Sequence, residues 1–245
     1  MSRRTVIVHY HLFKNAGTSV DGLLRRHFAS AWREVEFHGI PPRRNGAALA
    51  GFIAAHPELQ AVSSHTAMLP LPEIENVDIL PIIFVRHPLL RLKSAYSFER
   101  LQQMDSIGPS LARVLPFIGY ARALVALGNR QAINFQTERF CANEPPRKGT
   151  EIERALRTIE RLPYVGLVEA FDESVARLEA YLKPHFPDFQ GEPLRLNVTN
   201  PTQATVAEQL RALRDEVGAR QYAFLTRHNR DDIALFERAQ QDYRQ

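Results

Sequence analysis

The chain has 245 residues, 44% of them hydrophobic and 24% charged, which is enough for one α/β domain with a sizeable core. Its formal net charge of +4 is compatible with an anionic ligand but too small to indicate general nucleic-acid binding. A single cysteine, Cys141, excludes an internal disulfide framework, and no apolar stretch approaches the ~20 residues of a membrane helix. We therefore expect a soluble, cytoplasmic protein.

The first part of the chain predicts two strands with helices between them. Residues 5–13, TVIVHYHLF, are rich in β-branched and aromatic side chains, which favours a buried strand. Apolar residues at helical spacing from Thr18 onward predict a helix directly behind that strand. Residues 40–46, IPPRRNG, are predicted to form a loop. A short helix over residues 47–55 and a strand over residues 59–65, LQAVSSH, are expected next.

The middle of the chain repeats this alternation. Residues 78–88, DILPIIFVRHP, predict a second strong strand, and residues 89–104 predict a helix after it. Helical patterns follow over residues 117–141 and, more regularly, over residues 151–162. A short strand is expected over residues 164–168, YVGLV.

The last part of the chain is predicted to be helical except for one loop. A helix should end near Leu182, a proline-rich loop should span residues 183–203, and two amphipathic helices should follow from residue 204. Strands that alternate with helices predict a three-layer α/β fold with a central, largely parallel sheet flanked by helices. We expect one domain over residues 1–245, with a core over about 5–182 and extra C-terminal helices over about 204–245.

The stretch HYHLFKNAGTSV looks like a phosphate-binding loop between a strand and a helix. The first N–H groups of a helix and its dipole attract an anion, and the small residues Ala16 and Gly17 let the backbone approach it. Thr18 and Ser19 add hydroxyl groups, and Lys14 adds a positive charge. The lysine stands before the glycine, unlike the common nucleotide-binding order. An ordinary helix cap made by Thr18 or Ser19 is the alternative interpretation.

A second candidate anion site lies in FVRHPLLRLKSAYSF. Arg86 stands at the end of the predicted strand, and Ser94 lies eight residues further, about two turns into the following helix. A guanidinium and a hydroxyl that converge in this way suit a tetrahedral anion. In the alternative interpretation Arg86 forms a structural ion pair and Ser94 faces solvent. Two such sites would together hold two anionic groups of one ligand.

The two motifs resemble those of the sulfotransferases that use 3′-phosphoadenosine 5′-phosphosulfate (PAPS). HLFKNAGTS resembles their 5′-phosphosulfate loop, often H-x-P-K-(T/N)-(G/A)-G-T-S, and FVRHPLLRLKSAY resembles their 3′-phosphate element, often (F/V)-x-R-(D/N)-P-x-x-R-x-x-S-x-(Y/F). YVGLVEAFDESVARLEAYL and GNRQAINFQTERF resemble two further segments of the superfamily. The likeness extends from residue 6 to about residue 182 and is greatest to the carbohydrate branch, which includes heparan sulfate 2-O-sulfotransferases and bacterial relatives.

This resemblance implies a P-loop-like fold and PAPS as the donor, with no metal. Lys14 would contact the phosphosulfate group and would share in catalysis. Arg86 and Ser94 would bind the 3′-phosphate. Phe13 stands where the family usually has proline, and His87 stands where it usually has an acidic residue. The loop residues that would surround the donor are Lys14, Asn15, Ala16, Gly17, Thr18 and Ser19.

Transfer to a hydroxyl calls for a base, and histidine, with an ordinary pKa near ~6.5, suits that role at neutral pH. His65 ends a predicted strand at the sheet edge where ligands collect, and the likeness to 2-O-sulfotransferases implies that it is the base. His11, three residues before Lys14, is the rival and could instead orient the acceptor. His9 lies on the same strand face as His11, and we expect it in a hydrogen-bonded pair beneath the helices.

Two other functions remain open from the sequence. A nucleotide-dependent kinase would use similar loop chemistry but would need carboxylates for Mg²⁺, and Asp21 and Asp78 fit no such pattern. A non-catalytic protein that binds polyanions or glycans is the other alternative. For a sulfotransferase, the acceptor class implied by the resemblance is a glycan or another molecule with a hydroxyl group. We expect loops at 38–46, 104–116 and 183–203 to form the acceptor cleft.

Overall fold

The computed structural model describes residues 3–193 and 204–243, and the chain divides into two compact units. Unit 1 comprises Met1–Val85 and Arg139–Thr199, and unit 2 comprises Arg86–Glu138 and Asn200–Gln245. The chain therefore enters unit 2 directly after a strand, at Arg86, and returns to unit 1 at Arg139.

Unit 1 is built around a sheet in which every pair of neighbouring strands is parallel. The strand order is β2-β3-β1-β4-β5, so β1 lies in the middle of the sheet. The strands are β1 (Arg4–Tyr10), β2 (Trp32–Glu34), β3 (Ala61–Ser64), β4 (Val77–Val85) and β5 (Gly166–Leu167). β1 and β4 are buried on both faces for most of their length, which agrees with their runs of valine and isoleucine.

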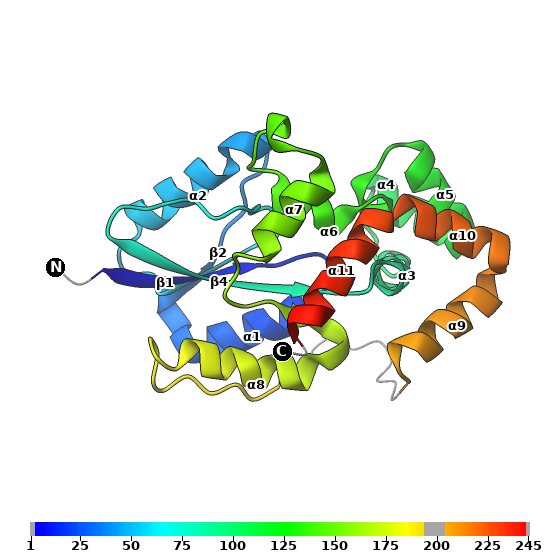
Figure 1. Cartoon of the computed structure of the whole chain (residues 1–245). Helices are drawn as coiled ribbons and strands as arrows, with labels where there is room; N and C mark the ends of the chain where they lie inside the picture. The colour runs from blue at the N-terminus through cyan, green and yellow to red at the C-terminus, as the bar shows by residue number, and fades with distance from the viewer. Residues whose placement is uncertain (1–2, 194–203, 244–245) are drawn as a thin grey trace. The chain divides into compact units, whose positions relative to one another are not determined.

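Helices cover both faces of this sheet. Figure 1 shows α1 (Gly17–Phe28) and α8 (Phe171–Leu182) on one face, and α2 (Pro42–Ala55) and α7 (Glu151–Ile159) on the other. On the first face, Ile7 of β1 and Phe84 of β4 share a core with Leu24 of α1 and Leu178 of α8. Burial of these side chains is the main force that holds the layers together. The structure confirms the predicted three-layer α/β class with a parallel central sheet.

Unit 2 is helical over the residues that the structure describes, with α3 (Pro88–Glu99) at its centre. Leu92 and Tyr96 of α3 pack with Phe117, Tyr120 and Leu225 in its core. α6 (Phe135–Cys141) crosses the division between the units. None of the helices in the described part of the chain is long and apolar enough to span a membrane. The other helices of unit 2 are α4 (Ile107–Val114), α5 (Phe117–Ala126), α9 (Val206–Val217), α10 (Ala219–His228) and α11 (Arg230–Tyr243).

The loop prediction for residues 40–46 is wrong from Pro42 onward, because α2 begins there. Proline at the first helical position has a suitable φ angle and lacks an N–H that would have no partner in any case. β2 has no counterpart among the predicted elements, because its three residues are too few to show an alternating pattern. Short helices of the 3₁₀ type follow several elements: Ala29–Ala31, Pro146–Lys148 and Val168–Ala170 in unit 1, and Arg130–Ala132 in unit 2.

The predictions for unit 2 also need correction. The segment 104–116 contains the helix α4, and the helix predicted over 117–141 is interrupted between α5 and α6, where Asn134 has a φ of 44°. The C-terminal segment holds three helices within its described residues instead of two, because Gly218, with a φ of 80°, separates α9 from α10. Residues 194–203 of the predicted loop lie outside the described residues.

Candidate active site

The chain passes from β1 into α1 through a tight loop at the carboxyl end of the sheet. β1 ends at Tyr10 and α1 begins at Gly17. Between them, Lys14 and Ala16 have positive φ angles of 65° and 61°. This left-handed conformation costs a residue other than glycine about 1–2 kcal/mol. Strained backbone of this kind gathers at functional sites, and here it gives the loop its curvature.

No side chain caps the start of α1. Ala16 is the cap residue, and its carbonyl accepts hydrogen bonds from the N–H groups of Ser19 and Val20 at 3.0 and 3.3 Å. The N–H groups of Gly17 and Thr18 donate to no residue that the structure describes. The alternative in which Thr18 or Ser19 is the helix cap is therefore wrong. Two backbone donors at a helix start are left for water or an anion.

Asn15 anchors the loop to the neighbouring strand. Its side chain is buried, and Nδ2 donates to the carbonyl of Phe84 in β4 at 2.7 Å. Its backbone N–H donates to the carbonyl of Leu12 at 3.1 Å, which closes the turn. A buried hydrogen bond of this kind is costly to break, so the position of the loop against β4 is well defined.

His11 turns its imidazole toward the start of α1. A Cβ atom added to Gly17 would lie 1.9 Å from Cδ2 and 2.2 Å from Nε2 of His11, far inside van der Waals contact. Only glycine therefore fits at position 17 without displacing the ring. We predicted that Gly17 lets the backbone approach an anion, and the structure shows a further reason for glycine, which is the room that His11 needs.

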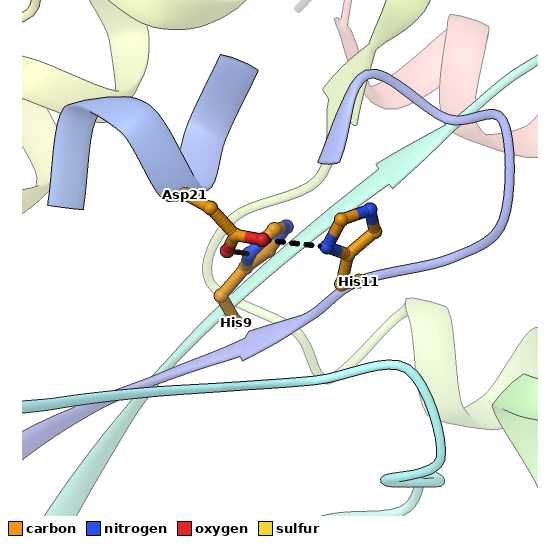
Figure 2. Close-up of side chains that lie close together, drawn as sticks. All are labelled: His9, His11 and Asp21. Atoms are coloured by element: carbon orange, nitrogen blue, oxygen red, sulfur yellow. Dashed lines mark hydrogen bonds and ion pairs between the residues drawn. The ribbon is translucent and has the colours of Figure 1, made fainter. Parts of the chain in front are cut away.

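A buried carboxylate links two histidines beneath the loop. Figure 2 shows Asp21 of α1 between His9 and His11, which both come from the β1 side. Asp21 Oδ1 lies 2.7 Å from His9 Nδ1, and Asp21 Oδ2 lies 2.7 Å from His11 Nδ1. Because an ionised carboxylate only accepts hydrogen bonds, each histidine carries a proton on Nδ1. We expected the two histidines to bond to each other, but each bonds to Asp21 instead, and their rings stack with centroids 5.3 Å apart.

The pKa values of this group follow from burial and from its hydrogen bonds. Burial raises the pKa of Asp21, but the charges and hydrogen bonds of His9 and His11 outweigh burial, so that pKa lies well below its usual range. Burial also lowers the pKa of His11 below its ordinary value of 6.5, although the hydrogen bond that His11 donates to Asp21 opposes this effect. At neutral pH the site therefore holds an ionised Asp21 and a neutral His11 whose Nε2 carries a lone pair.

His65 stands directly after β3 and beside His11. β1 and β3 pair in register with Tyr10 opposite Ser64, so the next two residues, His11 and His65, emerge side by side from adjacent parallel strands. Their rings stack with centroids 3.8 Å apart and an interplanar angle of 29°. The predicted place of His65, at the carboxyl edge of the sheet, is confirmed.

Glu36 holds the ring of His65 in one orientation. Glu36 Oε1 lies 2.9 Å from His65 Nδ1, and Oε2 accepts from the hydroxyl of Thr66 at 2.6 Å. Glu34 is more distant, with Oε1 3.4 Å from the same Nδ1. Burial raises the pKa of Glu36, but the hydrogen bonds from Thr66 and His65 outweigh it and hold that pKa below its ordinary value. With Nδ1–H donated to a carboxylate, Nε2 is the ring atom that can accept a proton.

Two sets of side chains in unit 1 have donor atoms close enough together to suit a metal ion. One set is His9, His11 and Asp21, and the other is Glu34, Glu36 and His65. In the first set, both Nδ1 atoms and both carboxylate oxygens are engaged with one another. In the second, both oxygens of Glu36 already accept hydrogen bonds from protein. We therefore interpret both sets as hydrogen-bonded networks, which the sequence spacing had not revealed.

The second predicted anion element belongs to unit 2. Arg86 is held through its backbone by Gln136, whose Oε1 accepts from the Arg86 N–H at 2.9 Å and whose Nε2 donates to the Arg86 carbonyl at 2.8 Å. His87 is buried with its ring edge-on to Phe236, with centroids 5.4 Å apart. Ser94 lies half-buried in the second turn of α3. Gln136 thus fixes the backbone of Arg86, one position before His87, where the family usually has an acidic residue.

The structure therefore divides the predicted site residues between the two units. Lys14 to Ser19 and His65 lie in unit 1, where His11 touches both Gly17 and His65. Arg86 and Ser94 lie in unit 2. Sequence reasoning missed Glu36 and the role of Asp21. The sequence holds one signal for Asp21. It is the fifth residue of a helix whose neighbouring apolar residues face the core, and a charged side chain buried there needs a partner.

The fold and the site define an α/β protein with a strand–loop–helix turn whose helix start is uncapped, and with a histidine held by a carboxylate at the edge of a parallel sheet. No known family model matches the chain. It is 35% identical over 250 residues to an uncharacterized protein of Archaeoglobus fulgidus, an alignment that covers 99% of this chain and 98% of the archaeal one. The chain belongs to the same family as that archaeal protein.

Proposed function

We propose that the protein is a sulfotransferase that moves the sulfuryl group of PAPS to an acceptor hydroxyl, with a carbohydrate as the acceptor class. The observation that carries the proposal is the loop of Lys14, whose uncapped helix start lies on the same sheet edge as His65. A base with its Nδ1–H held by Glu36 and a cationic loop for an anionic group are the two parts that this reaction needs.

The residues of the loop suit the phosphosulfate end of the donor. The N–H groups of Gly17 and Thr18 and the ammonium of Lys14 would bind its anionic oxygens. Arg86 and Ser94 are proposed for the 3′-phosphate on the strength of the motif that they share with PAPS enzymes, and Gln136 fixes the backbone of Arg86. When bound, the donor supplies a sulfuryl group on a phosphate leaving group, so the chain needs only to bind, orient and move a proton.

In the proposed reaction, Nε2 of His65 takes the proton from the acceptor hydroxyl. The acceptor oxygen forms a bond to sulfur as the bond from sulfur to the bridging oxygen breaks, and the bridging oxygen keeps that electron pair on 3′-phosphoadenosine 5′-phosphate. Lys14 and the loop N–H groups stabilise the charge that grows on the leaving oxygen. Glu36 stabilises the imidazolium that forms on His65, as a carboxylate does in other histidine dyads.

Transfer of labelled sulfate from PAPS to a panel of glycans, read by mass, tests this function. Lys14→Ala and His65→Ala should each abolish transfer, while His65→Ala should bind 3′-phosphoadenosine 5′-phosphate almost as well as the original protein. Lys148→Ala and His56→Ala are matched controls, because Lys148 pairs with Glu144 and His56 bonds to the Phe52 carbonyl, both away from the loop. Full activity of the His65 variant would show that another group is the base.

A ligand comparison separates this function from its alternatives. Thermal stabilisation by 3′-phosphoadenosine 5′-phosphate, but not by ATP with Mg²⁺, is the expected result. Stabilisation by ATP with Mg²⁺ alone would favour a kinase. Binding of 3′-phosphoadenosine 5′-phosphate without transfer to any acceptor of a broad panel would favour a non-catalytic binding protein.

A further inference from the structure

His11 has no part in the proposed reaction. Its side chain is buried, with 7% of the residue exposed, and its Nδ1 is engaged by Asp21 at 2.7 Å. Its Nε2 has no hydrogen-bond partner among the residues that the structure describes. Figure 2 shows this second ring nitrogen on the side away from Asp21, toward the loop that leads into α1. The contact with Gly17 places the same edge of the ring against the first residue of the helix.

We propose that His11 is a ligand of the anion in the loop, and that it takes up one proton from solvent on Nε2 as the anion binds. The proposal rests on the proposed function for the identity of the ligand, a phosphosulfate or diphosphate group, but not for the site itself. Nε2 of this buried histidine, beside two unused backbone donors, is a third donor once it is protonated. In the step, only the Nε2–H bond forms, and the buffer supplies the proton.

The surroundings of His11 suit this change of charge. Asp21 of α1, engaged on the opposite side of the ring, would stabilise an imidazolium, as the paired carboxylate does in a catalytic triad. The other titratable groups that face His11 are His9 on β1 and His65 after β3. Lys14 lies in the same loop. In the empty site burial keeps His11 neutral, so its lone pair would repel an anion. An anion close to Nε2 reverses this balance, because it favours the charged form of the ring.

The consequence is a linkage between anion binding and pH. Because one more proton is bound in the complex than in the free protein, affinity should rise as the pH falls from 8 to 6.5. The slope approaches but does not exceed about tenfold per pH unit for one proton. A histidine that only packs beneath the loop would give no proton uptake, since its protonation state would be the same with and without ligand.

Titration calorimetry in two buffers of different ionisation enthalpy measures the proton uptake directly. The probes are 3′-phosphoadenosine 5′-phosphate and inorganic pyrophosphate, each added to the full chain at pH 7. We expect uptake of a substantial fraction of one proton with the original protein. His11→Asn, whose amide can keep a donor near the Nδ1 position for Asp21, should lose the uptake and bind about tenfold more weakly. His11→Gln, which places a neutral amide near the Nε2 position, should lose the uptake but keep more of the affinity.

His9→Asn is the matched control, because His9 shares the carboxylate of Asp21 without touching Gly17. It should keep the proton uptake. Circular dichroism and melting of each variant establish that it is folded. Proton uptake that persists in both His11 variants, or its absence in the original protein, would overturn the role of His11. If 3′-phosphoadenosine 5′-phosphate still binds in that case, the proposed function stands. Uptake with pyrophosphate alone would sustain His11 but count against PAPS, and binding of neither probe would overturn both.

Discussion

Glu36 holds His65 at two points, because its Oε1 atom lies 2.9 Å from both the backbone nitrogen and the ring Nδ1 of His65. The same carboxylate accepts from the hydroxyl of Thr66 through its other oxygen. Three donors thus depend on one acidic side chain. The orientation of His65 is therefore fixed by a residue in the segment after β2, a strand that the sequence analysis did not recognise.

Replacement of this carboxylate should weaken the fold and remove part of its acid sensitivity. Glu36→Gln should lower the free energy of unfolding by about 1–3 kcal/mol, since donors that bonded to an anion now face a neutral amide. The pKa of Glu36 lies below its ordinary value in the folded protein, so its contribution is present above that value and is lost as the pH falls through the lowered pKa. Urea unfolding at pH 7 and pH 4 should show a smaller difference for the variant.

Glu34→Gln is the control for this measurement. Glu34 is exposed to a larger extent and lies 3.4 Å from His65 Nδ1, so its replacement should change the free energy of unfolding by less than about 0.5 kcal/mol. An equal loss in both variants would mean that Glu36 has no special role at His65.

Addition of one methyl group at position 17 should disturb the loop. Gly17→Ala should lower the free energy of unfolding by about 1–3 kcal/mol, because the new Cβ would overlap the ring of His11. Gly51→Ala makes the same change in α2, where nothing lies within 4 Å, and should raise stability by about 0.5–1 kcal/mol through helix propensity. Thermal melts of the two variants should move in opposite directions. A gain in both would show that the contact between Gly17 and His11 is absent in solution.

The buried His87 should make the protein sensitive to mild acid. Burial lowers its pKa from 6.5 to about 4, so the folded state favours the neutral ring. The stabilisation is complete above pH 6.5 and is lost as the pH falls toward 4, to a total of about 3 kcal/mol. His87→Leu removes this titration. The variant should therefore show a flatter dependence of unfolding free energy on pH between 6.5 and 4, and identical slopes would contradict the assignment.

Relief of the strained cap residue should stabilise the loop. Ala16 is left-handed with a φ of 61°, a conformation in which glycine avoids the clash of Cβ with the backbone. Ala16→Gly should raise the free energy of unfolding by up to about 1 kcal/mol. Urea unfolding of the variant and of the original protein measures this difference. A loss of stability would show that the left-handed angle is not kept in solution.

The layers and the loop before α1 could be predicted because they depend on local patterns. The runs of β-branched residues in β1 and β4, and the small residues before α1, carry their information within a few positions. The short strand β2 could not be predicted in this way. A three-residue strand exists only through its pairing with β3.

The networks of the candidate site needed the register of the strands. His11 and His65 are 54 positions apart in sequence, and only the pairing of Tyr10 with Ser64 brings them together. Likewise Glu36 reaches His65 from a neighbouring strand end, and Gln136 reaches Arg86 across 50 positions. Periodicity assigns a face to each of these side chains, but it does not say which partner lies across from it.

The two hydrogen bonds to Asp21 also provide proton signals that can be used to detect binding in the loop. Two short, buried N–H bonds to one carboxylate should exchange slowly with solvent, and their protons should resonate far downfield in a proton spectrum. Only the one on His11 lies next to the loop. Binding of an anion in the loop should therefore shift the resonance of the His11 proton and leave that of the His9 proton nearly unchanged. Proton NMR can then follow binding without an added label.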